Sequence, residues 1–73
     1  GLKKIMEFRY NGRVLVFSRQ LNRKKQPLFQ SEYFYSGYGK LVKTRVFIHS
    51  TGETVNYLQD ENGNVIDVIR EPR

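Results

Sequence analysis

The segment Glu32–His49 reads EYFYSGYGKLVKTRVFIH, and its second half alternates with the two-residue period of a β-strand. Val42, Val46 and Ile48 fall on one side of that strand. The other side carries two cations, an aromatic ring and an imidazole: Lys43, Arg45, Phe47 and His49. One side therefore suits a protein core, whereas the other combines positive charge with aromatic surface.

Turn signals on either side of this segment divide the chain into further short strands. Ser36–Gly39 contains two glycines around Tyr38, and we predict a turn there that exposes the tyrosine. The dipeptides Asn11-Gly12, Thr51-Gly52 and Asn62-Gly63 each separate two strand-like runs. Asn-Gly is the strongest short hairpin signal, because both turn positions require a positive φ. We therefore predict a hairpin at each of the three dipeptides.

The hairpin positions also predict how the strands pair. With Asn11 and Gly12 as a two-residue loop, Tyr10 faces Arg13, and four apolar residues share one face: Met6 and Phe8, paired with Phe17 and Leu15. In the Thr51-Gly52 hairpin, the same requirement for an aligned apolar face pairs Ile48 with Val55 and Val46 with Tyr57.

The strand pattern is interrupted between Gln20 and Gln30. We expect a loop there, because Pro27 disfavours helix at Gln26. A helical turn near Leu21 could form part of this loop. The cluster Arg23-Lys24-Lys25 within it fits either an ordinary solvated loop or an arm that grips phosphates.

From Leu28 to Tyr35 the alternation resumes, with Tyr33 and Tyr35 on one face and Phe34 on the other. We expect Phe34 in the core.

These patterns predict a single all-β domain over residues 1–73. With five to six short strands joined by hairpins, it would form a small, strongly bent antiparallel sheet or a partly open barrel of OB or SH3-like type. Such arrangements bury one face of the sheet and protect its edges.

Composition limits the classes of function. The 73 residues include no cysteine, which favours a reducing, cytoplasmic compartment. We see no signal peptide and no apolar run near the roughly 20 residues of a membrane helix, so no membrane partner is expected. The net charge is +6 and unevenly distributed: residues 1–45 hold eleven Lys and Arg against Glu7 and Glu32, and residues 46–73 hold two against five carboxylates. A basic region of this kind attracts polyanions, although small soluble proteins also carry such charge.

Little in the sequence suggests catalysis. His49 is the sole histidine, and no cysteine or spaced Ser/His/acid set accompanies it. Gly37-x-Gly39 lacks the further residues of a phosphate loop, and Asp60, Asn62 and Asn64 lack the glycine and distal glutamate of a calcium loop. We expect no enzymatic activity, no cofactor and no metal site.

We instead expect a binding module for nucleic acid, DNA or RNA, with single strands favoured. Single-strand binders combine a basic groove with aromatic rings on which bases stack. The candidate binding residues are Arg19, Arg23, Lys24, Lys25, Tyr33, Tyr35, Tyr38, Lys40, Lys43, Arg45, Phe47 and His49. The alternative is an accessory or inhibitory module that docks on a larger protein through this aromatic and basic surface or an edge strand, with homodimerisation as a variant of it.

Residues 36–49 also show a local resemblance to a known family. Val46-Phe47-Ile48-His49 resembles the Val-Phe-Val-His stretch of cold-shock domains, and Ser36-Gly37-Tyr38-Gly39 is similar to the Lys-Gly-Phe-Gly that precedes it. In that family the corresponding aromatics and histidine stack on single-stranded bases. Here the two segments lie closer together, and Lys40 stands where an aromatic is expected. We interpret the resemblance as similar surface chemistry, without family membership.

Overall fold

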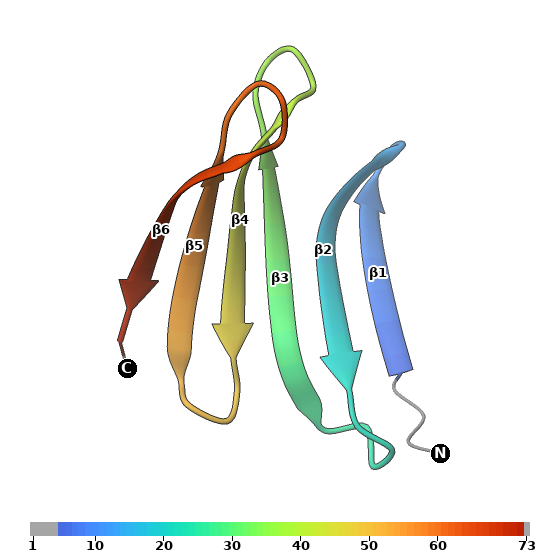
Figure 1. Ribbon diagram of the computed structural model, residues 1–73. Helices are drawn as coiled ribbons and strands as arrows, with labels where there is room; N and C mark the ends of the chain where they lie inside the picture. Colours follow the sequence, from blue (N-terminus) through green and yellow to red (C-terminus); the bar gives the residue numbers. More distant parts are fainter. Residues whose placement is uncertain (1–4, 73) are drawn as a thin grey trace.

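The chain forms one antiparallel sheet whose six strands lie side by side in sequence order (Figure 1). The computed structural model describes residues 5–72. Its strands are β1 (Ile5–Asn11), β2 (Val14–Leu21), β3 (Pro27–Tyr35), β4 (Leu41–Ile48), β5 (Glu53–Gln59) and β6 (Val65–Glu71). The predicted all-β antiparallel class is confirmed. The sheet is open rather than closed into a barrel, because β1 and β6 each pair with a single neighbour and form its two edges.

The strand register defines two faces of different chemistry. One row of paired residues crosses all six strands, and it consists of Arg9, Phe17, Glu32, Arg45, Asn56 and Ile69. The adjacent row points to the opposite side and consists of Phe8, Ser18, Ser31, Val46, Val55 and Arg70.

We call the side of the first row the charged face. It includes Glu7, Arg9, Phe17, Arg19, Gln30, Glu32, Phe34, Lys43, Arg45, Phe47, Thr54, Asn56, Leu58, Asp67, Ile69 and Glu71. The other side, the apolar face, comprises Met6, Phe8, Tyr10, Leu15, Ser18, Gln20, Phe29, Ser31, Tyr33, Thr44, Val46, Ile48, Glu53, Val55, Tyr57, Val68 and Arg70.

Burial is slight because the sheet is a single layer. Within residues 5–72, Leu21 and Val55 are the only buried apolar side chains, and Ser18 and Asn56 are the buried polar ones. Many large apolar side chains are exposed, above all on the two edge strands, and every residue of β6 is exposed. Domains normally bury an apolar sheet face against a second layer. The described residues supply no such layer.

Three of the connecting turns share one five-residue geometry. They begin at Asn22, Ser36 and Asp60, whose side-chain oxygens accept the N–H groups of the third and fifth turn residues. The first residue donates to the carbonyl of the fifth, and the fourth donates to the carbonyl of the first. The fourth residue has a positive φ in each turn: 63° at Lys25, 80° at Gly39 and 84° at Gly63. The turns predicted at Ser36–Gly39 and at Asn62-Gly63 are confirmed.

Each of these turns is followed by a β-bulge. The second residue of the outgoing strand has no partner in the register, and it is apolar in every case: Leu28, Val42 and Ile66. A bulge adds one residue to one strand and increases the local twist. Repetition of the same turn and bulge thus gives the open sheet its twist.

The predicted register of the first hairpin is wrong. The connecting residues are Gly12 and Arg13, with Asn11 paired to Val14, and Val16 forms an extra bulged residue. The shift pairs Phe8 with Ser18 and Phe17 with Arg9. A one-residue shift moves a side chain to the other side of the sheet. Phe17 consequently lies on the charged face, away from Met6 and Phe8.

Two other expectations need correction. Ile48 pairs with Glu53, and Val46 with Val55, because Gly52 donates to the Ile48 carbonyl at 2.8 Å and closes a tight turn. The predicted register is wrong by two residues, and because side chains alternate with a period of two, the apolar residues still share one face. The loop expected over residues 20–30 is also much shorter. It spans residues 22–26, because the Asn22 side chain organises the turn and lets β2 and β3 continue up to it.

Candidate nucleic-acid interface on the charged face

The centre of the charged face is an aromatic ring covered by cations. Phe34 on β3 pairs with Lys43 on β4, whose Nζ lies 5.3 Å from the ring centroid, and the Arg45 guanidinium carbon lies 5.5 Å from it. Both distances are typical of cation–π contacts. Phe34 was expected in the core, but 36% of it is exposed. It is a candidate site residue that the sequence analysis missed, because only the β3–β4 register shows which face of β4 it joins.

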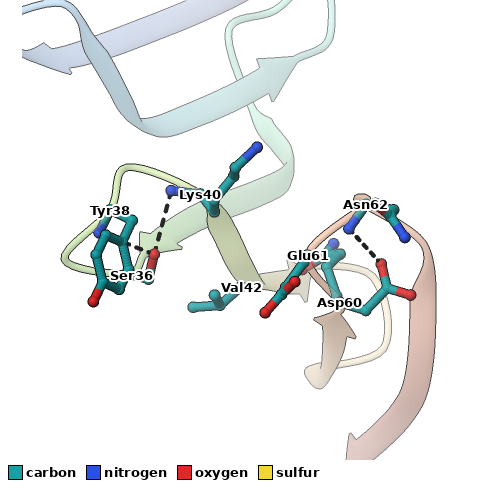
Figure 2. Close-up of a pocket in the computed structure, with 8 residues that line it drawn as sticks. Ser36, Tyr38, Lys40, Val42, Asp60, Glu61 and Asn62 are labelled. Atoms are coloured by element: carbon teal, nitrogen blue, oxygen red, sulfur yellow. Dashed lines mark hydrogen bonds between the residues drawn. The ribbon is translucent and has the colours of Figure 1, made fainter.

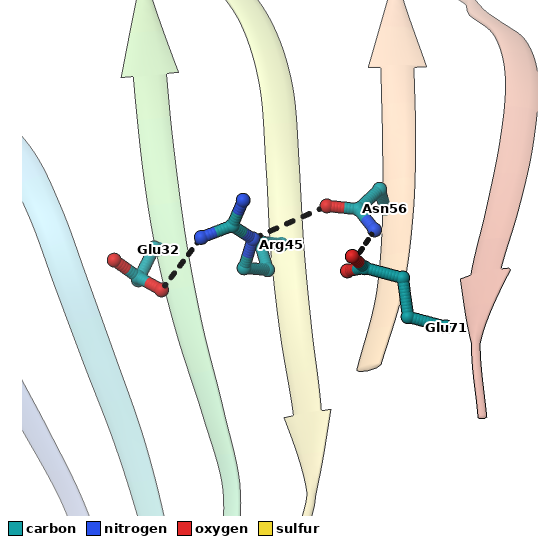
Figure 3. Close-up of polar contacts among 4 residues, drawn as sticks. All are labelled: Glu32, Arg45, Asn56 and Glu71. Atoms are coloured by element: carbon teal, nitrogen blue, oxygen red, sulfur yellow. Dashed lines mark hydrogen bonds and ion pairs between the residues drawn. The ribbon is translucent and has the colours of Figure 1, made fainter. Parts of the chain in front are cut away.

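A chain of polar contacts fixes Arg45 in this arrangement (Figure 3). Its Nε donates to the Asn56 side-chain oxygen at 3.2 Å, and its guanidinium lies 3.7 Å from the Glu32 carboxylate. Asn56 in turn donates to Glu71 at 2.8 Å and to the Ile69 carbonyl at 3.3 Å. Asn56 is only 5% exposed, whereas the Arg45 and Glu32 side chains are 38% and 50% exposed, so the ladder has a buried centre and solvated ends. The guanidinium plane is thereby held in place, although its charge is partly balanced.

A second cation–aromatic pair lies on the strands at the β1 edge. The Arg9 guanidinium carbon is 4.9 Å from the Phe17 ring centroid. Beside it, the Arg19 Nε donates to Glu7 at 2.7 Å, and both side chains are well exposed. Exposed ion pairs contribute little to stability, so Arg19 can exchange Glu7 for another anion at small cost.

Phe47 and His49 extend the aromatic surface along β4. Their ring centroids are 4.7 Å apart at an interplanar angle of 83°, an edge-to-face contact. The predicted placement of Phe47 on the same side as Lys43 and Arg45 is confirmed by the register. His49 follows β4 in the turn, and its ring joins this side through the contact with Phe47. The His49 N–H donates to the Leu28 carbonyl at 3.0 Å, which places His49 beside the start of β3 and the cationic turn that precedes it.

The remaining candidate cations lie in turns at both ends of the sheet. Arg23, Lys24 and Lys25 occupy the exposed β2–β3 turn, at the end of the sheet that also holds the β4–β5 turn (Figure 1). Lys40 lies in the β3–β4 turn at the opposite end. On strands β1 to β4, the charged face itself carries four Lys and Arg against two carboxylates, whereas β6 contributes Asp67 and Glu71. The positive part of the face is therefore its β1–β4 side.

Two candidate tyrosines lie on the opposite side of the sheet. Tyr33 and Tyr35 alternate with Phe34 and so point away from Lys43 and Arg45. The Tyr33 hydroxyl shares a 3.0 Å hydrogen bond with Ser18, and the Tyr35 hydroxyl donates to the Leu15 carbonyl at 2.7 Å. These bonds fasten β3 to β2, and the two tyrosines do not join the group around Phe34.

Tyr38 lies apart from both groups, at the tip of the β3–β4 turn, and is 95% exposed. An open groove separates this turn from the β5–β6 turn, with Val42 between them (Figure 2). Lys40 borders one side of the groove, and Asp60 and Glu61 border the other. The mixed charges give this groove no clear preference for an anion.

Residues 5–72 contain no group of three or more His, Asp, Glu or Cys side chains placed to hold a metal ion. The same stretch forms no helix of the length and apolarity that a bilayer crossing requires.

Comparison with known proteins adds no relative: no family model, no curated protein and no solved structure matches this chain.

Proposed function

We propose that the charged face binds single-stranded nucleic acid without catalysing a reaction. The observation that carries the proposal is the joint presentation of Phe34, Lys43, Arg45, Phe47 and His49 on one side of two adjacent strands. Single-strand binders use this combination of stacking surfaces and cations, and bases stack on arginine guanidinium planes as well as on rings.

The contacts suggest a path for the strand along β4. From Lys43 to His49 the path covers about 20 Å at the rise of an extended chain. Bases would stack against Phe47 and on the Arg45 guanidinium that covers Phe34. Phosphates would contact Lys43 along the path and the cationic turn, Arg23, Lys24 and Lys25, near its end. Arg9 over Phe17 offers a second stacking position toward the β1 edge.

A specific observation favours a second candidate, a protein-interaction module. Every residue of β6 is exposed, four of its side chains are large and apolar, and no described strand pairs with its outer side. Such an edge is a template for the addition of a strand from another protein. Salt separates the two candidates, since phosphate binding weakens steeply with ionic strength and strand addition does not.

The test is a fluorescence-polarisation titration with single- and double-stranded DNA and RNA oligomers at two salt concentrations. The key variant is Phe34→Ala, and the matched control is Phe29→Ala on the same strand. These rings are 36% and 41% exposed but lie on opposite faces. Phe34→Ala removes the ring that supports the Arg45 guanidinium, and it should weaken single-strand binding by about 1–3 kcal/mol, the range for loss of a stacking platform.

Phe29→Ala should leave that affinity unchanged, and Phe47→Ala should behave like Phe34→Ala. Equal losses from the Phe34 and Phe29 variants would contradict a site on the charged face. A parent protein that binds no oligomer at low salt would contradict the proposal as a whole and leave the protein-interaction module.

A further inference from the structure

The apolar face is the largest feature of the sheet that the proposed function does not use. Its charged groups among the described residues are Glu53 and Arg70, which pair with each other at 3.6 Å between carboxylate and guanidinium. The other side chains of this face are aliphatic, aromatic or polar without a charge. Several of its side chains are strongly exposed: Met6 at 46%, Phe8 at 54%, Phe29 at 41% and Val68 at 46%. Contiguous apolar surface of this extent marks an interaction site in a soluble protein.

Several polar groups of this face are bonded within the sheet. Ser18 bonds to Tyr33, the Tyr35 hydroxyl bonds to Leu15, and Gln59 Nε2 donates to Thr44 at 3.1 Å. Of the polar side-chain atoms buried in the described residues, the Gln59 Oε1 alone is without a partner. These groups would keep their partners when the face is covered, which lowers the desolvation cost of docking.

Charge and area identify the occupant as a second copy of the chain. Two charged faces would oppose like cations, and a charged face against an apolar one would strip water from charges without pairing them. Two apolar faces bring together nothing that repels. The molecule measures 38 by 31 Å in its two longer dimensions. A face of that size offers on the order of 1,000 Å², against the roughly 800 Å² that a stable interface buries on each partner.

We propose that two copies pack apolar face to apolar face as a symmetric β-sandwich dimer. The contact is isologous, since the same patch serves both subunits. Each sheet supplies the second layer that the other lacks, at the spacing of about 10 Å that packed sheets adopt. Both charged faces then point outward, so the dimer carries its proposed nucleic-acid surfaces on opposite sides.

The first experiment measures mass by sedimentation equilibrium over a wide dilution series. Val68→Lys tests the apolar face, and Ile69→Lys is its control. These neighbours on β6 are 46% and 48% exposed but lie on opposite faces. The parent and Ile69→Lys should reach twice the 8.7 kDa of one chain. For Val68→Lys the dissociation constant should rise by about 100-fold or more, because the symmetric interface receives the unpaired charge twice.

A second measurement, thiol labelling, tests the dimer even if Val68→Lys fails to fold. The chain has no cysteine, so a single thiol can be placed by Ser31→Cys on the apolar face or by Gln30→Cys on the charged face. Thiol labelling should slow with rising protein concentration for the Ser31 variant alone.

A folded parent that stays monomeric at every concentration would overturn the proposal and leave the face to a different partner. Equal loss of the dimer in the Val68 and Ile69 variants would also overturn it, because pairing of β6 edges is sensitive to both positions.

Discussion

At the scale of single residues, Lys25 is the non-glycine position whose backbone conformation is unfavourable for a residue with a side chain. It has a φ of 63°, whereas glycines occupy the equivalent place in the other two five-residue turns. A side chain with a Cβ pays roughly 1–2 kcal/mol in the left-handed region. Lys25→Gly should therefore raise the free energy of unfolding by about 0.5–1 kcal/mol, after the added freedom of the unfolded chain is counted. Chemical denaturation measures the change.

The control for that variant is Lys24→Gly, which removes the same charge from a residue without a positive φ. It should leave stability unchanged or lower it slightly. Equal stabilisation by both variants would show that relief of charge repulsion, and not backbone strain, is responsible.

Asn56 is the residue on which the polar ladder depends. It is 5% exposed and connects Arg45 to Glu71. Asn56→Leu keeps the volume but leaves those partners without their hydrogen bonds, and it should lower the free energy of unfolding by about 1–3 kcal/mol. Thr54→Val, two positions away on the same face of β5, should change it by about 0.5 kcal/mol or less. A thermal melt in which the two variants behave alike would contradict a structural role for the ladder.

At the scale of elements, we expect the cationic turn between β2 and β3 to contribute to affinity for nucleic acid without contributing to sequence selectivity. Arg23, Lys24 and Lys25 are exposed in a turn whose hydrogen bonds come from Asn22 and the backbone. Their charges can neutralise phosphates but have no rigid frame from which to read base edges. Changing all three to Ala should weaken binding of every oligomer alike and reduce the salt slope by about 2.

The measurement is the same polarisation titration, extended to several salt concentrations. The matched control is Glu61→Gln, in the turn of the same geometry between β5 and β6, which should leave the slope unchanged. An unaltered slope in the triple variant would assign the three cations to an ordinary solvated loop.

At the scale of the whole molecule, the strand order turns the uneven charge along the sequence into an uneven charge across the sheet. Each strand lies beside its sequence neighbours, so the basic stretch 5–45 lies in β1 to β4 and the turns between them, and the acidic part follows on β5 and β6. A field of this kind orients an approaching polyanion toward the β1–β4 side. Nucleic-acid binding is thus expected on the β1–β4 side of the sheet.

Stability should decline from the inner strands to both edges. Each of the four inner strands, β2 to β5, is hydrogen-bonded to a neighbour on both sides, whereas β1 and β6 have one neighbour each and β6 is exposed throughout. Native-state hydrogen exchange should accordingly show the greatest protection on β3 and β4 and the least on β1 and β6, because fraying needs only the loss of one neighbour. Strong protection of β6 in a monomer would contradict an uncovered edge.

The sequence alone determined the features that depend on local chemistry. The period-two alternation placed Lys43, Arg45 and Phe47 on one side, and the glycines after Ser36 and Asp60 fixed two turns, since a positive φ closes them. Tertiary structure decided which residues share a face across strands. The bulge at Val16 moved Phe17 beside Arg9, and the β3–β4 register brought Phe34 under Lys43 while Tyr33 and Tyr35 went to the other side. A bulge shifts the pairing by one residue and so reverses the face, and its occurrence depends on the partner strand. The open edge has the same origin, because whether β1 meets β6 follows from the twist accumulated over all six strands rather than from any one of them.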